Sequence, residues 1–260
     1  MKAKSLYYVD ETKPWLQPEA GWPPEVPKNY DFPEITLYQM LVDAVQKYSN
    51  QNAIWFLNSF MTYQDLLDHV DSFASGLHKI GIRKGDVVAI ALPSCFQYVV
   101  AYYACAKLGA IVTGVNPTYK PGEVLHELKL TQAKTLIILD ALYNPLIEPI
   151  SSQYKIDTFI STNIADLLNI SSIKKWLGKK LKKIPTGSTP SGSIKFLDLL
   201  RSPRLNLKHD VDPSDTATYI MTGGTTGVPK AAVLSHFNCV SNAIQVSLWV
   251  WMKEPGAFMI

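Results

Sequence analysis

Three short apolar runs separated by helical segments constrain the fold of this 260-residue chain more than any other feature. Residues 87–92, 110–115 and 135–139 are almost continuously apolar, which is typical of parallel strands that helices cover on both faces. The segments between them, 96–108 and 123–131, predict helices. This alternation of strand and helix predicts an α/β fold with a doubly wound, mostly parallel sheet.

The residues before these strands predict further elements with recognisable starts. Apolar side chains at helical spacing after Thr36 predict a helix that this threonine caps. Residues 53–57 and 60–63 predict two strands joined by a tight turn at 58–59, and Thr62 is expected to cap the helix that follows.

Charge and cysteine content constrain the partners of this chain and the compartment in which it folds. The chain has 25 basic and 22 acidic side chains, but six of the lysines fall within residues 174–183, which contain no acid. Without them, 19 basic side chains face 22 acidic ones. A nucleic-acid binder would spread its basic residues along a stripe or face, so we expect no nucleic-acid partner. The three widely spaced cysteines, Cys95, Cys105 and Cys239, are interpreted as reduced core residues, which indicates a reducing compartment.

The segment with the clearest chemistry follows a predicted strand at 217–221 and precedes a predicted helix at 237–249. Its glycines allow backbone N–H groups to converge on an anion, its hydroxyls can donate to phosphate oxygens or bind Mg²⁺, and its lysine offsets negative charge. It lacks the Walker A and G-x-G-x-x-G patterns. We therefore predict a polyphosphate-binding loop made of Thr222, Gly223, Gly224, Thr225, Thr226, Gly227 and Lys230.

This loop resembles the phosphate-binding signature of the adenylate-forming superfamily, which includes the acyl-CoA synthetases. Two earlier stretches also resemble family motifs: Met61-Thr-Tyr-Gln-Asp-Leu66, and residues 85–93 with 107–110 and 115–117. The resemblance covers about residues 36–245. The Gly223-Gly224 pair is similar to that of the fatty acyl-CoA ligases, whereas Ala231 departs from the usual glycine after the lysine.

The resemblance implies that ATP and a fatty acid form an acyl-adenylate and pyrophosphate, and that coenzyme A then displaces AMP to give a thioester. It assigns Thr222 to Mg²⁺, and Thr225, Thr226 and Lys230 to the phosphate oxygens. His236 either orients the loop or caps a helix. No catalytic residue is assigned within this chain.

By the same resemblance the chain is an incomplete N-terminal domain of the adenylate-forming fold. We divide it into a proline- and aromatic-rich arm at 1–33, a first α/β subdomain at 34–210 with a basic insertion near 170–193, and the truncated start of a second α/β subdomain at 211–260. We expect the fragment to be inactive alone and to need a missing C-terminal part or a second copy. The alternative is a non-catalytic phosphate-binding remnant or one half of a split ligase.

The basic segment has two interpretations. Apolar residues at helical spacing run along one side of it, and most of its lysines lie on the other. One interpretation is a helix, Lys174 to Lys183, that docks on anionic lipid, so that a cytoplasmic protein contacts the inner membrane face. The other, which we prefer from the sequence, is a solvated helix with its apolar side on the core. The apolar residues are Ile173, Trp176, Leu177, Leu181 and Ile184.

Overall fold

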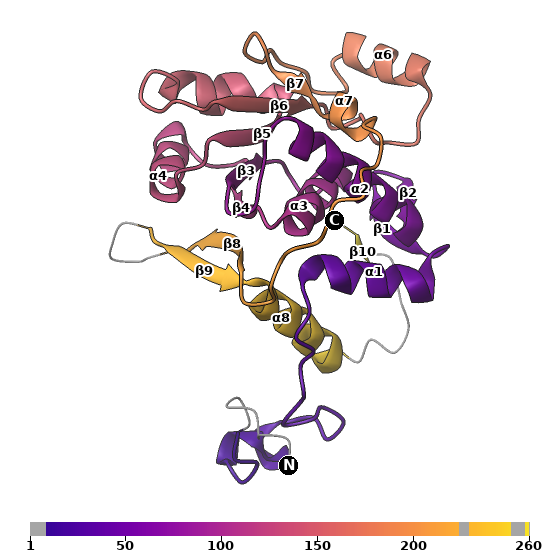
Figure 1. The fold of residues 1–260 in the computed structure, drawn as a ribbon, viewed down its shortest axis with the longest axis vertical. Helices are drawn as coiled ribbons and strands as arrows, with labels where there is room; N and C mark the ends of the chain where they lie inside the picture. Colours follow the sequence, from indigo (N-terminus) through magenta and orange to yellow (C-terminus); the bar gives the residue numbers. More distant parts are fainter. Residues whose placement is uncertain (1–8, 224–228, 251–257, 260) are drawn as a thin grey trace.

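A seven-stranded sheet forms the centre of the computed structural model, which describes residues 9–223, 229–250 and 258–259 (Figure 1). All neighbouring strands are parallel except the last pair, which is antiparallel. The predicted α/β class with a mostly parallel sheet is confirmed. In spatial order the strands are β7 (Ile194–Lys195), β6 (Thr158–Thr162), β5 (Thr135–Leu139), β3 (Val87–Ala91), β4 (Ile111–Gly114), β8 (Thr216–Met221) and β9 (Ala231–Ser235).

Helices cover both faces of this sheet, as a doubly wound fold requires. One face of the sheet packs in a large apolar core with α1 (Leu37–Tyr48), α2 (Tyr63–Lys79), α3 (Phe96–Leu108) and α7 (Phe196–Leu200). The other face packs against α4 (Pro121–Thr131) and the helical turns at 140–150. Consecutive strand residues contribute to opposite cores, so Ala89 lies in the second core and Ile90 in the first.

The helix starts follow from local chemistry. The Thr36 hydroxyl accepts a hydrogen bond from the Gln39 N–H at 3.1 Å, and Thr62 forms a reciprocal capping box with Asp65. Both side chains satisfy N–H groups that have no partner inside the helix. The two predicted N-caps are therefore confirmed.

A small second sheet contains β10 (Phe258–Met259), β1 (Asn52–Phe56) and β2 (Ser59–Thr62) in that order. The turn between β1 and β2 lies one residue earlier than predicted, because Leu57 and Asn58 adopt positive φ angles of 46° and 58°. A two-residue hairpin turn of this kind needs positive φ at both central positions.

Strand β9 is the element that the sequence prediction missed. We expected residues from 233 onward to lead directly into a helix, but Ala231–Ser235 pair antiparallel with β8, with Met221 opposite Ala231. Helix α8 (His236–Trp249) begins only after this strand. The predicted phosphate loop therefore joins two strands of a β-hairpin, not a strand and a helix.

The remaining described elements lie around this framework. The arm contains two short 3₁₀ turns, Pro14–Leu16 and Pro18–Ala20, and the Trp22 ring packs edge-on against Trp249 of α8 with centroids 5.2 Å apart. Short helical turns follow β5 at α5 (Asp140–Leu142), Tyr143–Ile147 and Glu148–Ile150, and α6 (Ser172–Lys180) follows β6. Among the described residues, no helix combines the length and apolar character needed to cross a bilayer. All three cysteines are free, and Cys95 and Cys105 are buried.

Candidate phosphate-binding site

The candidate site is the hairpin that joins β8 and β9 at one edge of the main sheet (Figure 1). The structure describes its two ends, Thr222 with Gly223 and Pro229 with Lys230. The predicted site residues Gly224, Thr225, Thr226 and Gly227 lie outside the described residues. The hairpin brings Thr222 and Lys230, which are eight positions apart, into direct contact.

Three hydrogen bonds close the base of the hairpin. The Thr222 N–H donates to the Lys230 carbonyl at 2.8 Å, and the Thr222 hydroxyl donates to the same carbonyl at 3.1 Å. The Lys230 N–H in turn donates to the Thr222 hydroxyl at 3.3 Å. Since a hydroxyl has one proton and two lone pairs, one lone pair of the Thr222 oxygen stays available to a ligand.

The space beside this base is open. Apart from Gly223 itself and its neighbours in the chain, no described atom lies within 4 Å of the position that a Cβ would take on Gly223. The Lys230 side chain is exposed. A pocket of about 730 Å³ lies between the hairpin and α4, with Lys230, Tyr219 and Val233 on one side and His126, Leu130 and Gln132 on the other.

His126 connects the hairpin to α4 and was not singled out from the sequence. Its Nε2 lies 2.9 Å from the carbonyl oxygen of Pro229, the residue just before Lys230. Because a carbonyl only accepts, this contact requires the tautomer or charge state with a proton on Nε2. A separation of 103 residues gives this pair no local sequence signature.

His236 lies at the other end of β9, away from the loop. It is fully buried, and its Nδ1 accepts a 3.4 Å hydrogen bond from the N–H of Leu37, the first residue of α1. Burial, together with the charge of His209, lowers the pKa of His236 to about 4. Of the two roles left open from the sequence, these contacts agree with helix capping, although the helix is α1 and α8 itself is capped by Ser235.

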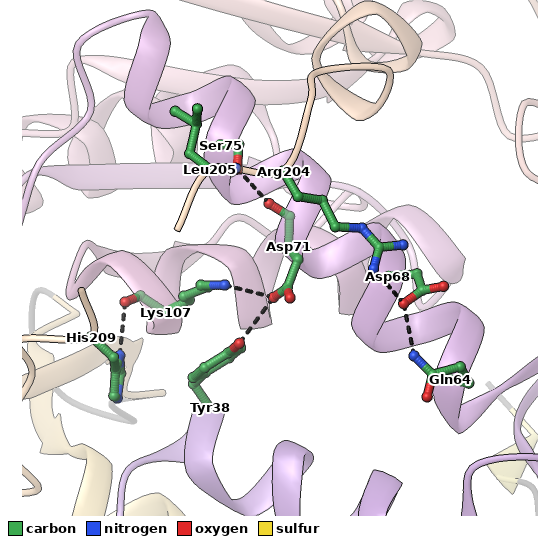
Figure 2. A network of polar contacts seen from close by, with 9 residues as sticks. All are labelled: Tyr38, Gln64, Asp68, Asp71, Ser75, Lys107, Arg204, Leu205 and His209. Atoms are coloured by element: carbon green, nitrogen blue, oxygen red, sulfur yellow. Dashed lines mark hydrogen bonds and ion pairs between the residues drawn. The ribbon is translucent and has the colours of Figure 1, made fainter. Parts of the chain in front are cut away.

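A polar network holds the segment that leads into β8 (Figure 2). Asp71 of α2 accepts hydrogen bonds from the Lys107 ammonium at 2.8 Å and from the Tyr38 hydroxyl at 3.0 Å. Burial opposes the charge of Lys107, but its hydrogen bonds to Asp71 and Tyr38 raise its pKa. His209 contacts the carbonyl of Lys107 at 2.9 Å, which ties the chain before β8 to α3. The buried lysine in α3 is thus neutralised by one carboxylate.

The same segment has two further attachments, both to α2. The Arg204 guanidinium forms an ion pair with Asp68 at 2.8 Å, and the Leu205 N–H donates to the Ser75 hydroxyl at 2.9 Å (Figure 2). These contacts attach the path between α7 and β8, the first strand of the hairpin, to α2.

This architecture, an α/β fold with a mostly parallel sheet, matches the N-terminal domain of adenylate-forming enzymes. The chain belongs to the family of AMP-binding enzymes, whose model matches residues 41–257. The resemblance stated from the sequence motifs is therefore confirmed.

Its relatives include long-chain-fatty-acid–CoA ligases of two bacteria. That of Bacillus subtilis (strain 168) is 29% identical over an alignment of 258 residues, which covers 96% of this chain and 44% of the relative. That of Salmonella typhimurium is 32% identical, with 95% and 45% covered. Thus the chain spans less than half the length of these curated relatives.

Two solved structures show the same fold. A long-chain-fatty-acid–CoA ligase from Archaeoglobus fulgidus superposes with a TM-score of 0.68 at 25% identity, covering 85% of this chain and 40% of that one. The anthranilate–CoA ligase AuaEII in complex with anthranoyl-AMP gives a TM-score of 0.64 at 21% identity, covering 78% and 35%.

Proposed function

We propose that this chain is the nucleotide-phosphate-binding, N-terminal portion of an ATP-dependent fatty acid–CoA ligase. In this reaction the fatty acid carboxylate attacks the α-phosphate of ATP, and pyrophosphate leaves. The thiol of coenzyme A then attacks the acyl carbon of the acyl-adenylate and AMP leaves. The observation that carries the proposal is the closed base of the β8–β9 hairpin, which lies with Lys230 beside an open pocket. The sequence between the two ends of this base is rich in Gly and Thr.

In this proposal the loop holds the β- and γ-phosphates, which become the leaving pyrophosphate. The backbone N–H groups of Gly223, Gly224 and Gly227 and the hydroxyls of Thr225 and Thr226 donate to phosphate oxygens. The ammonium of Lys230 neutralises charge. Such a loop contributes to catalysis by positioning the phosphates and stabilising their charge, since the protein has little covalent chemistry to perform in phosphoryl transfer.

The residues present fit a Mg²⁺ ion that arrives with the nucleotide. The Thr222 oxygen keeps one lone pair after its two hydrogen bonds to Lys230, so it can supply one ligand. Among the residues that the structure describes, no group of three His, Cys, Asp or Glu side chains could hold a metal. Mg²⁺ commonly binds through a few protein oxygens and the substrate phosphates, and Thr222 is the protein oxygen we propose. The ion would neutralise phosphate charge.

The substrates we propose are a fatty acid, ATP and coenzyme A. The polypeptide partner we propose is the rest of the ligase, or a second copy of this chain. The place of action we propose is the cytoplasm, with peripheral contact at the inner membrane face, where acyl chains collect. The names of the relatives, long-chain-fatty-acid–CoA ligases, support the substrate class.

Calorimetric titration of the chain with Mg-ATP and with AMP tests the phosphate site. A loop that holds the β- and γ-phosphates should bind ATP much more tightly than AMP. One charge-assisted hydrogen bond contributes about 1.5–3 kcal/mol, so Lys230→Met should weaken ATP binding about tenfold or more. Lys195→Met is the matched control, because Lys195 is an exposed lysine of β7 at the opposite edge of the same sheet. Equal affinity for ATP and AMP would contradict the proposal.

A chimera tests the ligase assignment separately. This chain replaces the matching 44% of the Bacillus subtilis ligase, and pyrophosphate release is followed with and without a fatty acid. Release that depends on both ATP and the fatty acid is expected. A folded chimera that binds ATP but releases no pyrophosphate would refute the ligase assignment and leave the phosphate site standing.

A further inference from the structure

The apolar stripe of α6 faces solvent. Ile173, Trp176, Leu177 and Leu181 are 76%, 61%, 44% and 55% exposed, and no residue of α6 is buried. The sequence-based preference for an apolar side on the core is therefore wrong. Figure 1 shows α6 at the rim of the molecule, beyond α7, and all four side chains of the stripe are exposed.

The lysines on the opposite side of α6 explain this orientation. The Lys175 ammonium donates to the carbonyl of Asp166 at 2.8 Å, and Lys179, one helical turn further on, is half-buried. Side chains four residues apart lie on the same side of a helix. That side is held against the body of the protein, and the stripe consequently points outward.

The chain after α6 folds back on the helix and adds cations to the stripe. The Gly178 carbonyl accepts from the N–H groups of Lys183 and Ile184 at 2.9 and 3.0 Å, and Lys182 adopts a left-handed conformation with φ of 56°. A Cβ on Gly178 would lie 2.7 Å from the Ile184 Cδ1, so these residues pack closely. Helix and return segment form one ordered unit.

The charged residues along this stretch of the sequence are all lysines. Lys174, Lys180, Lys182 and Lys183 are exposed, and the Lys180 ammonium lies 5.0 Å from the centre of the Trp176 ring. No acidic residue occurs between Asp166 and Asp198. Protein–protein interfaces are usually depleted of lysine, whereas an aromatic and aliphatic stripe flanked by lysines matches an anionic lipid surface.

We propose that residues 173–183 form a docking surface for anionic phospholipid bilayers. Ile173, Trp176, Leu177 and Leu181 enter the headgroup region, and the four exposed lysines contact lipid phosphates. The helix lies flat, since the contact of Lys175 with Asp166 keeps its other side on the protein. The purpose of this docking, the collection of fatty acid from a bilayer, rests on the proposed function. The binding to lipid depends only on the surface of residues 173–183.

Vesicle sedimentation of the whole chain tests the proposal. Vesicles of phosphatidylcholine alone are compared with vesicles that also contain phosphatidylglycerol, at low and high salt. We expect binding to the anionic vesicles that salt weakens. One lysine near an anionic surface changes partitioning about fivefold, so replacing Lys174, Lys180, Lys182 and Lys183 with Gln should abolish measurable binding. The double variant Ile173→Ser/Trp176→Ser should lose at least tenfold.

The matched control carries the same change of charge elsewhere. Lys79, Lys129, Lys195 and Lys208 are exposed, and their joint replacement with Gln should leave vesicle binding intact. An equal loss of vesicle binding in both quadruple variants would show that only net charge matters and would overturn the proposal. Vesicle binding that changes with neither the four lysines nor the stripe would also overturn it. Self-association through the stripe without vesicle binding would overturn it as well.

Mg-ATP titration of each variant separates this inference from the proposed function, because α6 contributes no residue to the hairpin. Variants that keep ATP binding are folded. Vesicle binding without ATP binding in the parent chain would remove the proposed function and leave the docking surface. ATP binding without vesicle binding would remove only the docking surface.

Discussion

Gly76 of α2 lies against α7 so closely that no side chain fits there. A Cβ on this glycine would lie 2.6 Å from the Leu199 carbonyl oxygen, 2.8 Å from its Cβ and 2.9 Å from its Cα. Two of these atoms belong to the backbone, so rotation of the Leu199 side chain cannot relieve the overlap. Gly76→Ala must push α7 away from α2.

The size of the effect follows from two opposing contributions. Forcing an extra methyl group into a packed core costs about 1–3 kcal/mol, and this case belongs near the upper end because three atoms clash at once. Alanine is favoured over glycine inside a helix by about 1 kcal/mol. The strain is larger, so we expect the free energy of unfolding to fall by about 1–2 kcal/mol. The stack of Phe73 on Phe196, whose centroids are 4.0 Å apart, should loosen as well.

Gly122→Ala is the control with the opposite expected sign. Gly122 is the second residue of α4, and apart from its chain neighbours and the backbone of its own helical turn, no described atom lies within 4 Å of the position of its Cβ. An alanine there should stabilise the protein by about 0.4–1 kcal/mol, because it restricts the unfolded chain. Urea unfolding of both variants and the parent measures the difference. If Gly76→Ala proves as stable as the parent, the close approach of α2 and α7 is not rigid and the reasoning fails.

Three further predictions concern the hairpin and its surroundings. The pKa of His236 is lowered from the ordinary 6.5 to about 4 in the folded protein. As the pH falls from 7 towards 4, the unfolded chain therefore takes up the proton first, and the free energy of unfolding drops by about 3 kcal/mol. Urea titrations at several pH values should show that His236→Asn removes this pH dependence, and an unchanged dependence would exclude His236 as its source. His126→Ala removes the contact with the Pro229 carbonyl and should weaken Mg-ATP binding several-fold, whereas His78→Ala, in α2, should leave it unchanged. Calorimetric titration of both variants measures the difference. Thr222→Val should lose both hydroxyl hydrogen bonds at the hairpin base and reduce Mg-ATP affinity about tenfold, against no change for Thr158→Val at the start of β6.

The elements that could be predicted from the sequence are those whose cause is local. The runs at β3 and β5 are apolar throughout because helices cover both faces of these strands. Thr36 and Thr62 are caps because a hydroxyl at that position reaches an N–H three residues on. Each inference needed only neighbours in the sequence.

The orientation of α6 and the existence of β9 could not be predicted in this way. Helical spacing gives α6 an apolar side, but the side that faces the protein is decided by the contact of Lys175 with the carbonyl of Asp166, which has no sequence pattern. All five residues of β9 are at least partly exposed, so they lack the buried run that reveals the central strands. Pairing with β8 makes it a strand.

The candidate site combines both kinds of information. Its composition of Gly, Thr and Lys is local, and from the sequence alone it indicates the family and predicts a phosphate ligand. Its support is not local: His126 reaches Pro229 from α4, and the segment before β8 is held by α2 and α3. Thr222 belongs to both groups, since the hydroxyl expected to face Mg²⁺ also closes the hairpin on Lys230. A substitution at Thr222 therefore changes the shape of the loop and its chemistry together, and Thr222→Ser, which keeps the hydroxyl, is the variant expected to preserve both.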